Sequence, residues 1–312
     1  MSDRVFVLGG ANLDLVARST GPLVEGSSNP GHLAERPGGV ARNIAENLAR
    51  LGDTVQVVAA IGDDLAARVL LDNAAECGIG LDYVVRSPHP TGRYAALHAH
   101  DGELALAIND MHATESLTAA DVAPALAQLT AEDLVFVDAN VPPEVVTAVA
   151  EASAAVGARL VADPVSVAKG PRMWAALHPR PWLLAPNLGE LQALTGRALT
   201  IQDVPAVAAM LIEDGVTHVW VKLGSSGSIL VSAAEGGAHP DAVSFTAPTV
   251  KVVDVTGAGD ALFAGFLHAY GEGATVAEAA AYGHVVSALA ISSDHTVRPD
   301  LSPALVETAA KG

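Results

Sequence analysis

The chain has 312 residues, of which 50% are hydrophobic, and its formal net charge at pH 7 is −18. This length allows one large α/β domain or two ordinary ones, and the negative charge argues against nucleic acid or an anionic membrane as partner. The apolar runs are too short or too glycine-rich to span a bilayer. Cys77 is the only cysteine, which excludes an intramolecular disulfide and a cysteine-based zinc site. We therefore expect a cytoplasmic protein.

Short apolar runs alternate with segments of helical periodicity along much of the chain. The runs typical of buried strands are Arg4–Leu8, Thr54–Ala60, Leu134–Asp138, Arg159–Asp163, Trp182–Ala185 and His218–Leu223. The segments with helical periodicity are Val40–Leu51, Leu65–Ala75, Glu144–Ala155, Leu188–Thr195 and Val204–Glu213. After Asp260 the chain is mostly helical up to Lys311. This alternation predicts an α/β fold, with a mostly parallel sheet covered by helices on both faces and ligands beyond the carboxyl ends of its strands.

Two regions depart from the alternation, at about residues 15–37 and 81–110. Both are rich in turn residues, and apolar residues alternate with a period of two through Tyr94–His100 and Glu103–Ala107. We expect them to form a small separate sheet within a single domain of residues 1–312. Such a sheet could be a lid that excludes water from a reaction or a dimerisation flap without a catalytic part. Its exposed strands favour a homodimer through the lid.

The segment Val253–Asp260, followed by an apolar stretch, carries the clearest chemical signal. Its small residues let backbone N–H groups converge where a helix begins, and such a helix start binds anions. Asp260 would repel a phosphate, but it suits a base that takes a proton from an attacking hydroxyl. This pairing indicates phosphoryl transfer, although a tight turn with an aspartate in the first helical turn explains the same residues.

Two further groups of polar residues and glycines lie near the N-terminus. Asn12 and Asp14 follow the first predicted strand on the same side of an extended segment, where a carboxylate suits a polyol and an Asx turn is the alternative. Gly38 and Gly39 open a helix whose backbone could approach a ligand closely, with Asn43 one turn further in. An ordinary amphipathic helix is the alternative there.

Similar signals occur in the second half of the chain. Asn187 and Glu190 have the spacing of a capping box, and their oxygens could also hold magnesium through waters. The turn Lys222–Gly227 could admit an adenine ring or a phosphate, while an ordinary hairpin turn into Ser228–Ser232 explains it nearly as well. His284, in a predicted helix, could line the same pocket or simply pack.

In order and spacing, these motifs resemble the ribokinase-like (PfkB) family of carbohydrate and nucleoside kinases over essentially the whole chain. The motifs that carry the resemblance are Gly9–Asp14, Gly38-Gly39 with Asn43, Asn187–Glu190 and Asp254–Asp260. It is strongest to members that phosphorylate pseudouridine, through the segments Ser28–Gly31, Pro37–Leu48, Ala107–Met111 and Asp163–Ser166. Val40 stands where ribokinase usually has a lysine, which counts against ribose as the main substrate.

The resemblance implies ATP-dependent phosphorylation of the 5′-hydroxyl of pseudouridine, with Mg²⁺ and optionally K⁺. It implies that Asp260 is the base and that the amides of Gly257, Ala258 and Gly259 form the anion hole. The acceptor would be bound by Asn12, Asp14, Asn29, Gly38, Gly39, Asn43, Asn109 and Met111, of which Asn29, Asn109 and Met111 would read the base.

On the other side of the reaction, ATP would be bound by Asn187, Lys222, Gly224, Gly227, Thr256 and His284. Glu190 and Asn187 would hold magnesium through water, and Asp254 a monovalent cation. A general nucleoside, ribose or fructose kinase is the alternative within the family. A non-catalytic sugar or nucleoside sensor is the alternative outside it.

Overall fold

The computed structural model describes residues 4–233 and 240–311, and its largest element is an eight-stranded sheet in the order β14-β13-β12-β11-β10-β9-β1-β4. The strands are β1 (Val5–Leu8), β4 (Val55–Val58), β9 (Leu134–Asp138), β10 (Arg159–Asp163), β11 (Leu183–Leu184), β12 (His218–Lys222), β13 (Ser228–Ser232) and β14 (Asp241–Phe245). All neighbours pair in parallel except β12–β13 and β13–β14. The mostly parallel sheet is confirmed. The antiparallel β12–β13 pair is the hairpin considered for residues 222–232, and β14 is an addition to the prediction.

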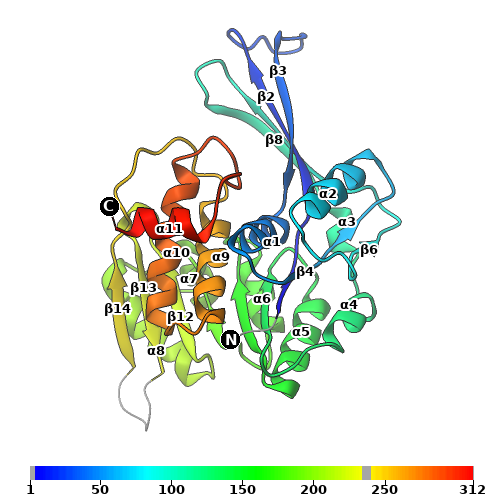
Figure 1. Cartoon of the computed structure of the whole chain (residues 1–312). Helices are drawn as coiled ribbons and strands as arrows, with labels where there is room; N and C mark the ends of the chain where they lie inside the picture. The colour runs from blue at the N-terminus through cyan, green and yellow to red at the C-terminus, as the bar shows by residue number, and fades with distance from the viewer. Residues whose placement is uncertain (1–3, 234–239, 312) are drawn as a thin grey trace.

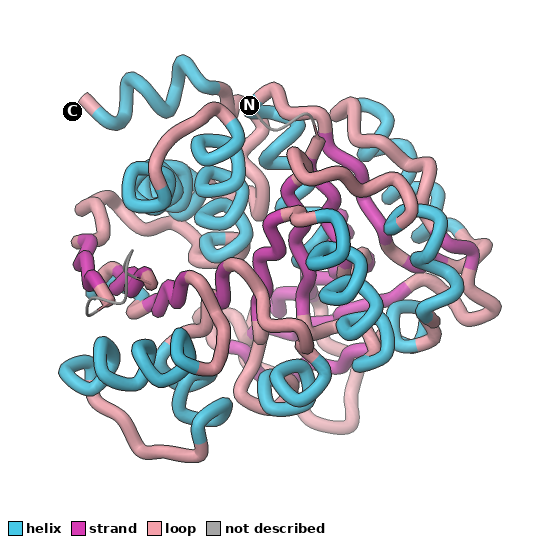
Figure 2. The backbone as a smooth tube through the Cα atoms, turned by 90° about the horizontal axis from the view of Figure 1, so that it is seen from below, coloured by secondary structure: helices cyan, strands magenta, loops and turns pink. Residues whose placement is uncertain are grey.

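Helices cover both faces of this sheet, as Figure 2 shows from below. One face packs against α4 (Ala119–Leu126), α5 (Pro143–Val156), α6 (Gly170–Ala176), α7 (Leu188–Thr195) and α8 (Val204–Glu213). The other packs against α1 (Val40–Leu51), α2 (Leu65–Glu76), α9 (Ala258–Gly271) and α10 (Val276–Ile291), with α11 (Pro303–Ala310) against α10. Among the described residues, no helix combines the length and apolar character needed to cross a lipid bilayer.

The alternation of side chains along each strand explains the two cores. Val5 and Val7 of β1 point into one core, while Phe6 and Leu8 point into the other. A strand that is buried on both faces needs an apolar residue at every position. The polar residues Asp138, Asp163 and Lys222 therefore stand at the carboxyl ends of their strands, where chemistry can be placed.

A four-stranded sheet in the order β3-β2-β7-β8 projects beyond the body (Figure 1). Its strands are β2 (Asn12–Ser19), β3 (Gly31–Gly38), β7 (Gly92–His98) and β8 (Leu104–Asp110). We call it the lid sheet. Residues 81–91 do not join it, contrary to the prediction: β6 (Val85–Arg86) instead pairs with β5 (Ala60–Ile61). Pro88 and Pro90 follow β6, and proline has no N–H with which to extend a ladder.

One face of the lid sheet carries a row of apolar side chains. Leu33, Ala17, Leu97 and Leu106 are successive partners across the four strands, so they share this face. Leu33 is 72% exposed and Leu106 is 59% exposed. The protomer therefore leaves much of this row uncovered.

Candidate active site

The site is organised by the turn that precedes α9. Gly257 caps the helix with a φ of 77°, and a Cβ atom there would lie 2.3 Å from the carbonyl oxygen of Thr296. Glycine is therefore required at this position for both reasons. The carboxylate of Asp254 accepts a hydrogen bond of 2.8 Å from the amide of Thr256, which holds the turn from the other side.

Two of the three predicted anion-hole amides remain available as donors. Within residues 4–233 and 240–311, the amides of Gly257 and Gly259 have no backbone acceptor, whereas the amide of Ala258 donates to the carbonyl of Val255 at 3.2 Å. The Ala258 amide is occupied because residues 255–258 form a tight turn at the start of the helix. Such free N–H groups at a helix N-terminus suit an anion.

Asp260 lies in the first turn of α9 and contacts α1. Its Oδ2 accepts a hydrogen bond of 2.7 Å from the amide nitrogen of Asn43. Part of its surface is open to solvent, yet it is surrounded by protein atoms, and this burial raises its pKa to about 7. The hydrogen bond from Asn43 and the charge of Arg42 lower this pKa, while the charges of Asp163 and Asp138 raise it. A carboxylate with this pKa can act as a general base near neutral pH.

Two separate pockets have lining residues next to Asp260. The first, which we call the α9–α10 pocket, has a volume of about 480 Å³ and includes Ala258 and Gly259 in its lining. The second, which we call the lid pocket, has a volume of about 210 Å³ and includes Asn43. Asp260 is therefore next in sequence to the wall of one pocket and hydrogen-bonded to the wall of the other.

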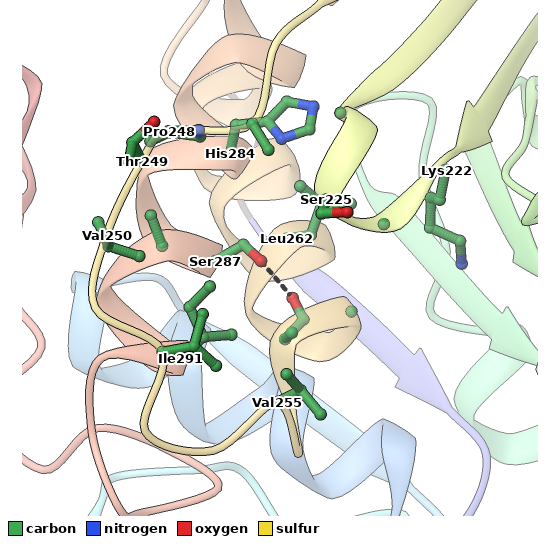
Figure 3. Close-up of a pocket in the computed structure, with 17 residues that line it drawn as sticks. Lys222, Ser225, Pro248, Thr249, Val250, Val255, Leu262, His284, Ser287 and Ile291 are labelled. Carbon is green, nitrogen blue, oxygen red and sulfur yellow. Dashed lines mark hydrogen bonds between the residues drawn. The ribbon is translucent and has the colours of Figure 1, made fainter.

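The α9–α10 pocket is mostly apolar, with polar groups at one end. Figure 3 shows Val250, Val255, Leu262 and Ile291 along its length, and the hydrogen bond of 2.9 Å from Ser287 to the carbonyl of Ala258. Of the residues predicted to bind ATP, four line this pocket: Lys222, Gly224, Gly227 and His284. An elongated apolar slot that ends at a helix N-terminus fits a nucleotide with its phosphates at the helix.

Internal hydrogen bonds fix two of these side chains. The ammonium of Lys222 lies 2.9 Å from the carboxylate of Asp163. The Ser228 hydroxyl accepts from the indole of Trp220 at 2.8 Å and lies 2.7 Å from Nε2 of His284. Burial lowers the pKa of His284, which favours the neutral imidazole, and its tautomer decides which of the two groups donates in the Ser228–His284 hydrogen bond.

Five residues predicted to bind the acceptor line the lid pocket: Asn12, Asp14, Gly39, Asn43 and Met111. Asn12 donates to the carboxylate of Asp14 at 2.5 Å, and burial raises the pKa of Asp14. A Cβ on Gly38 would lie 2.3 Å from this carboxylate. Glycine at position 38 therefore leaves room for Asp14 at the pocket wall.

Asn29, Asn109 and Thr256 are among the predicted residues that line neither pocket. Asn29 closes the loop between β2 and β3, where its side chain bonds to the backbone of Val24 and Ser27. These local bonds use its polar atoms, so the prediction that Asn29 reads a base is not supported by its position. Asn109 and Thr256 are exposed and line neither pocket. Asn109 is nevertheless the β8 partner of Tyr94, which pairs with Asp14, so it shares the face of the lid sheet that bears Asp14.

Asn187 and Glu190 form the capping box of α7. The Asn187 amide and side chain donate to Glu190 at 2.8 and 2.7 Å, and the Glu190 amide donates back at 2.9 Å. No group of three or more His, Cys, Asp and Glu side chains in the described chain is placed to hold a metal ion. Magnesium commonly keeps several waters and needs only one or two protein carboxylates; Glu190 is a buried carboxyl group here, and burial raises its pKa. Asp254 offers one carboxylate, already bonded to Thr256.

The lining of the lid pocket also includes residues that were not predicted as site residues, among them Tyr94, Thr114, Asn140 and Val165. The hydroxyl of Thr114 is buried without a hydrogen-bond partner in the described structure, and Asn140 accepts from the ammonium of Lys169 at 2.6 Å. Asn140 and Val165 follow β9 and β10. The strand ends of a parallel sheet are therefore the pattern that could have found them.

The sequence matches the model of the pfkB family carbohydrate kinases over residues 2–302. The chain belongs to this family. It is 33% identical to pseudouridine kinase of Escherichia coli, over 97% of this chain and 95% of that protein. It is similar to the structure of a carbohydrate kinase from Agrobacterium tumefaciens, with a TM-score of 0.82, 30% identity and coverage of 99% and 97%. For Arabidopsis thaliana ribokinase complexed with ribose and ATP, the TM-score is 0.81 at 25% identity, with coverage of 100% and 98%.

These similarities confirm the predicted family and the ribokinase-like fold. A pfkB kinase takes a phosphoryl group from ATP to a sugar or nucleoside, so the chain is a small-molecule kinase. The relatives named above differ in acceptor, and membership of the family does not choose among the acceptors.

Proposed function

We propose that this pfkB kinase phosphorylates the 5′-hydroxyl of pseudouridine with ATP. The observation that carries the proposal is the position of Asp260, between a free helix N-terminus facing the α9–α10 pocket and the amide of Asn43 in the lid pocket. The choice of pseudouridine is supported by the relative from E. coli and by the segments that resemble pseudouridine kinases. Val40 in place of a lysine argues against ribose.

In this proposal the acceptor occupies the lid pocket. Asp14, oriented by Asn12, accepts hydrogen bonds from ribose hydroxyls. Gly38 and Gly39 let the backbone pass close to the Asp14 carboxylate and to the carbonyl of Gly10. Asn43 contacts the ribose from α1. The base extends toward the lid-sheet side of the pocket, near Met111 and Asn109.

ATP occupies the α9–α10 pocket. Its adenine lies along the apolar lining near Gly224, Gly227 and His284, with Lys222 at the phosphate end, and Thr256 and Asn187 nearby. Glu190 and Asn187 would hold magnesium through water, and the ion would supply positive charge that offsets the charge of the phosphates. Asp254 as a monovalent-cation ligand and a cytoplasmic location both stay predictions from the sequence.

The chain's own groups then carry the transfer. Asp260 accepts the proton of the attacking hydroxyl as the oxygen approaches the γ-phosphate in line. The free amides of Gly257 and Gly259 donate to the charge that develops on the transferred group. The amide donors and partial positive charge of the helix start matter because the whole chain carries −18 and would repel an anionic substrate at long range.

We also propose a homodimer through the lid sheet. The exposed row that contains Leu33 and Leu106 is the support for this, since a contiguous apolar face on an otherwise acidic protein is typical of an interface. Tyr94 and Asp14 lie on the opposite face of the sheet. A partner on the apolar row would therefore leave the lid pocket clear.

The test measures ADP release from ATP and magnesium with pseudouridine, uridine, ribose and fructose as acceptors. We expect the highest kcat/KM with pseudouridine; preference for another acceptor would replace it with the general nucleoside or sugar kinase. Asp260→Asn should lose about 10³-fold or more in kcat while acceptor binding, measured by calorimetry, persists. Binding without ADP formation by the unmodified protein would indicate a sensor.

A further inference from the structure

A continuous chain of side-chain contacts leads from the buried side of α1 to Asp260. Glu46 forms ion pairs with Arg42 and Arg50. Arg42 donates to the side-chain oxygen of Asn43, and Asn43 donates to Oδ2 of Asp260 at 2.7 Å. Arg42 is only 4% exposed and Glu46 is 4% exposed, so solvent does not compete for these groups.

The order of donors and acceptors along this chain fixes the Asn43 amide. A guanidinium can only donate hydrogen bonds and an ionised carboxylate can only accept them. Arg42 therefore requires the oxygen of the Asn43 amide on its side, which leaves the nitrogen for Asp260. Without Arg42, the amide could rotate by half a turn and present its oxygen to the carboxylate, which would be repulsive.

The same arrangement distinguishes the two oxygens of Asp260. Oδ2 is occupied by Asn43, while no hydrogen bond from any described residue reaches Oδ1. An oxygen that already accepts a hydrogen bond is the weaker proton acceptor of the pair. Oδ1 is therefore the atom that takes the proton.

We propose that Arg42 is a positioning residue for the reaction: it holds the Asn43 amide so that Asn43 donates to Oδ2 of Asp260 and leaves Oδ1 as the base. This inference rests on the proposed role of Asp260. Arg42 itself is hydrogen-bonded to Asn43, Glu46, Asn73 and the carbonyl of Pro37. It is thus fixed on several sides and is suited to orienting a neighbour.

The ionisation of Asp260 reports on this chain of contacts. Asp260 is influenced by Arg42 from α1, by Asp138 at the end of β9 and by Asp163 at the end of β10, and Asp14 from the lid sheet acts on Arg42. The two aspartates and burial favour the protonated form, and Asn43 and Arg42 favour the ionised form. Losing the Arg42–Asn43 link should therefore raise the pKa of Asp260 above about 7.

The experiment compares the pH profiles of kcat/KM for Arg42→Gln, Arg42→Lys and the matched control Arg50→Gln. Arg50 pairs with the same Glu46 on the same helix, but it has no contact with Asn43. We expect the acid limb of Arg42→Gln to move up by about one pH unit, which lowers kcat/KM at pH 6 about tenfold. Arg50→Gln should keep the wild-type midpoint.

Arg42→Lys separates positioning from charge alone. Lysine keeps the positive charge but lacks the planar fork that reaches several acceptors at once. We expect Arg42→Lys to show most of the fall in kcat/KM at pH 6 that Arg42→Gln shows. A wild-type profile for Arg42→Lys would overturn the positioning role, and so would a profile of Arg42→Gln that matches Arg50→Gln. If Arg42→Gln does not fold, as judged by circular dichroism, Arg42→Lys alone decides in the same way.

A double-mutant cycle with Asn43→Ala tests whether Arg42 acts through Asn43. In the Asn43→Ala background, Arg42→Gln should produce a smaller shift of the acid limb, due only to the lost charge of Arg42; an undiminished shift would overturn the inference. Asp260→Asn distinguishes this failure from failure of the proposed function. An inactive Asp260→Asn with an unmoved Arg42→Gln profile rejects only the inference, whereas an active Asp260→Asn rejects the assigned base.

Discussion

Substituting Gly259 by alanine should separate activity from stability. Gly259 lies in the first turn of α9 with a negative φ, and a Cβ placed there meets no atom within 4 Å. The fold therefore tolerates the methyl group, and removing a helical glycine stabilises by up to about 1 kcal/mol. For a chain of this size this gain corresponds to an increase in Tm of about 2 °C.

The same methyl group enters the wall of the α9–α10 pocket, to which Gly259 contributes, and it crowds the free amides at the helix start. Losing one such donor in the transition state costs about 10²- to 10³-fold in kcat. Differential scanning fluorimetry and a coupled ADP assay measure the two effects. Gly273→Ala, beyond the other end of α9, is the matched control: its φ is 97° with open space around the Cβ, so it should lose about 1 kcal/mol and keep turnover. Full activity in a folded Gly259→Ala would refute the assignment of this helix start to the phosphoryl group.

Two further predictions concern an ion pair and the lid sheet. Lys222→Met leaves the buried Asp163 without its partner at 2.9 Å, so the free energy of unfolding should fall by about 3 kcal/mol and the KM for ATP should rise. The double variant Lys222→Met with Asp163→Asn should recover stability in urea titrations but not ATP affinity. Recovery of both would contradict a role for Lys222 at the phosphates. Leu106→Asp should convert a dimer to a folded monomer in sedimentation velocity, whereas Leu65→Asp, at a position 73% exposed on α2, should not; an unchanged mass for Leu106→Asp would reject the lid interface.

The sequence predicted the sheet and its helices because both cores depend on local patterns. Strands such as β1 are apolar at every position, and helices such as α7 begin at capping residues that are visible in the chain. Asn187 and Glu190 form the capping box that the sequence analysis gave as the alternative to a magnesium site. The antiparallel β12–β13 pair is the hairpin that was the alternative for Lys222–Gly227. The edge strand β14 was not predicted, because its close approach depends on Gly227, where a Cβ would lie 1.9 Å from the carbonyl of Phe245.

The site was predicted where its residues belong to one continuous motif, as at Gly257–Asp260. It was missed where distant elements supply single side chains. Thr114 follows the lid sheet, while Asn140 follows β9, and neither stands in a local pattern that indicates a ligand. The role of Asn29 stays a prediction, and in the structure its side chain hydrogen-bonds the backbone of its own loop, as loop asparagines often do. The Asn43–Asp260 bond joins residues 217 positions apart, a contact that no local spacing reveals.

The walls of the lid pocket come from two sheets, with Asp14 and Tyr94 on one and Asn140 beyond the end of the other. The helix start and the α9–α10 pocket belong to the body alone. Substitutions in β2, β7 and β8 can therefore accumulate without altering the machinery that moves the phosphoryl group. A kinase divided in this way can change the alcohol that it accepts through substitutions in the lid sheet, while the phosphoryl-transfer site stays the same.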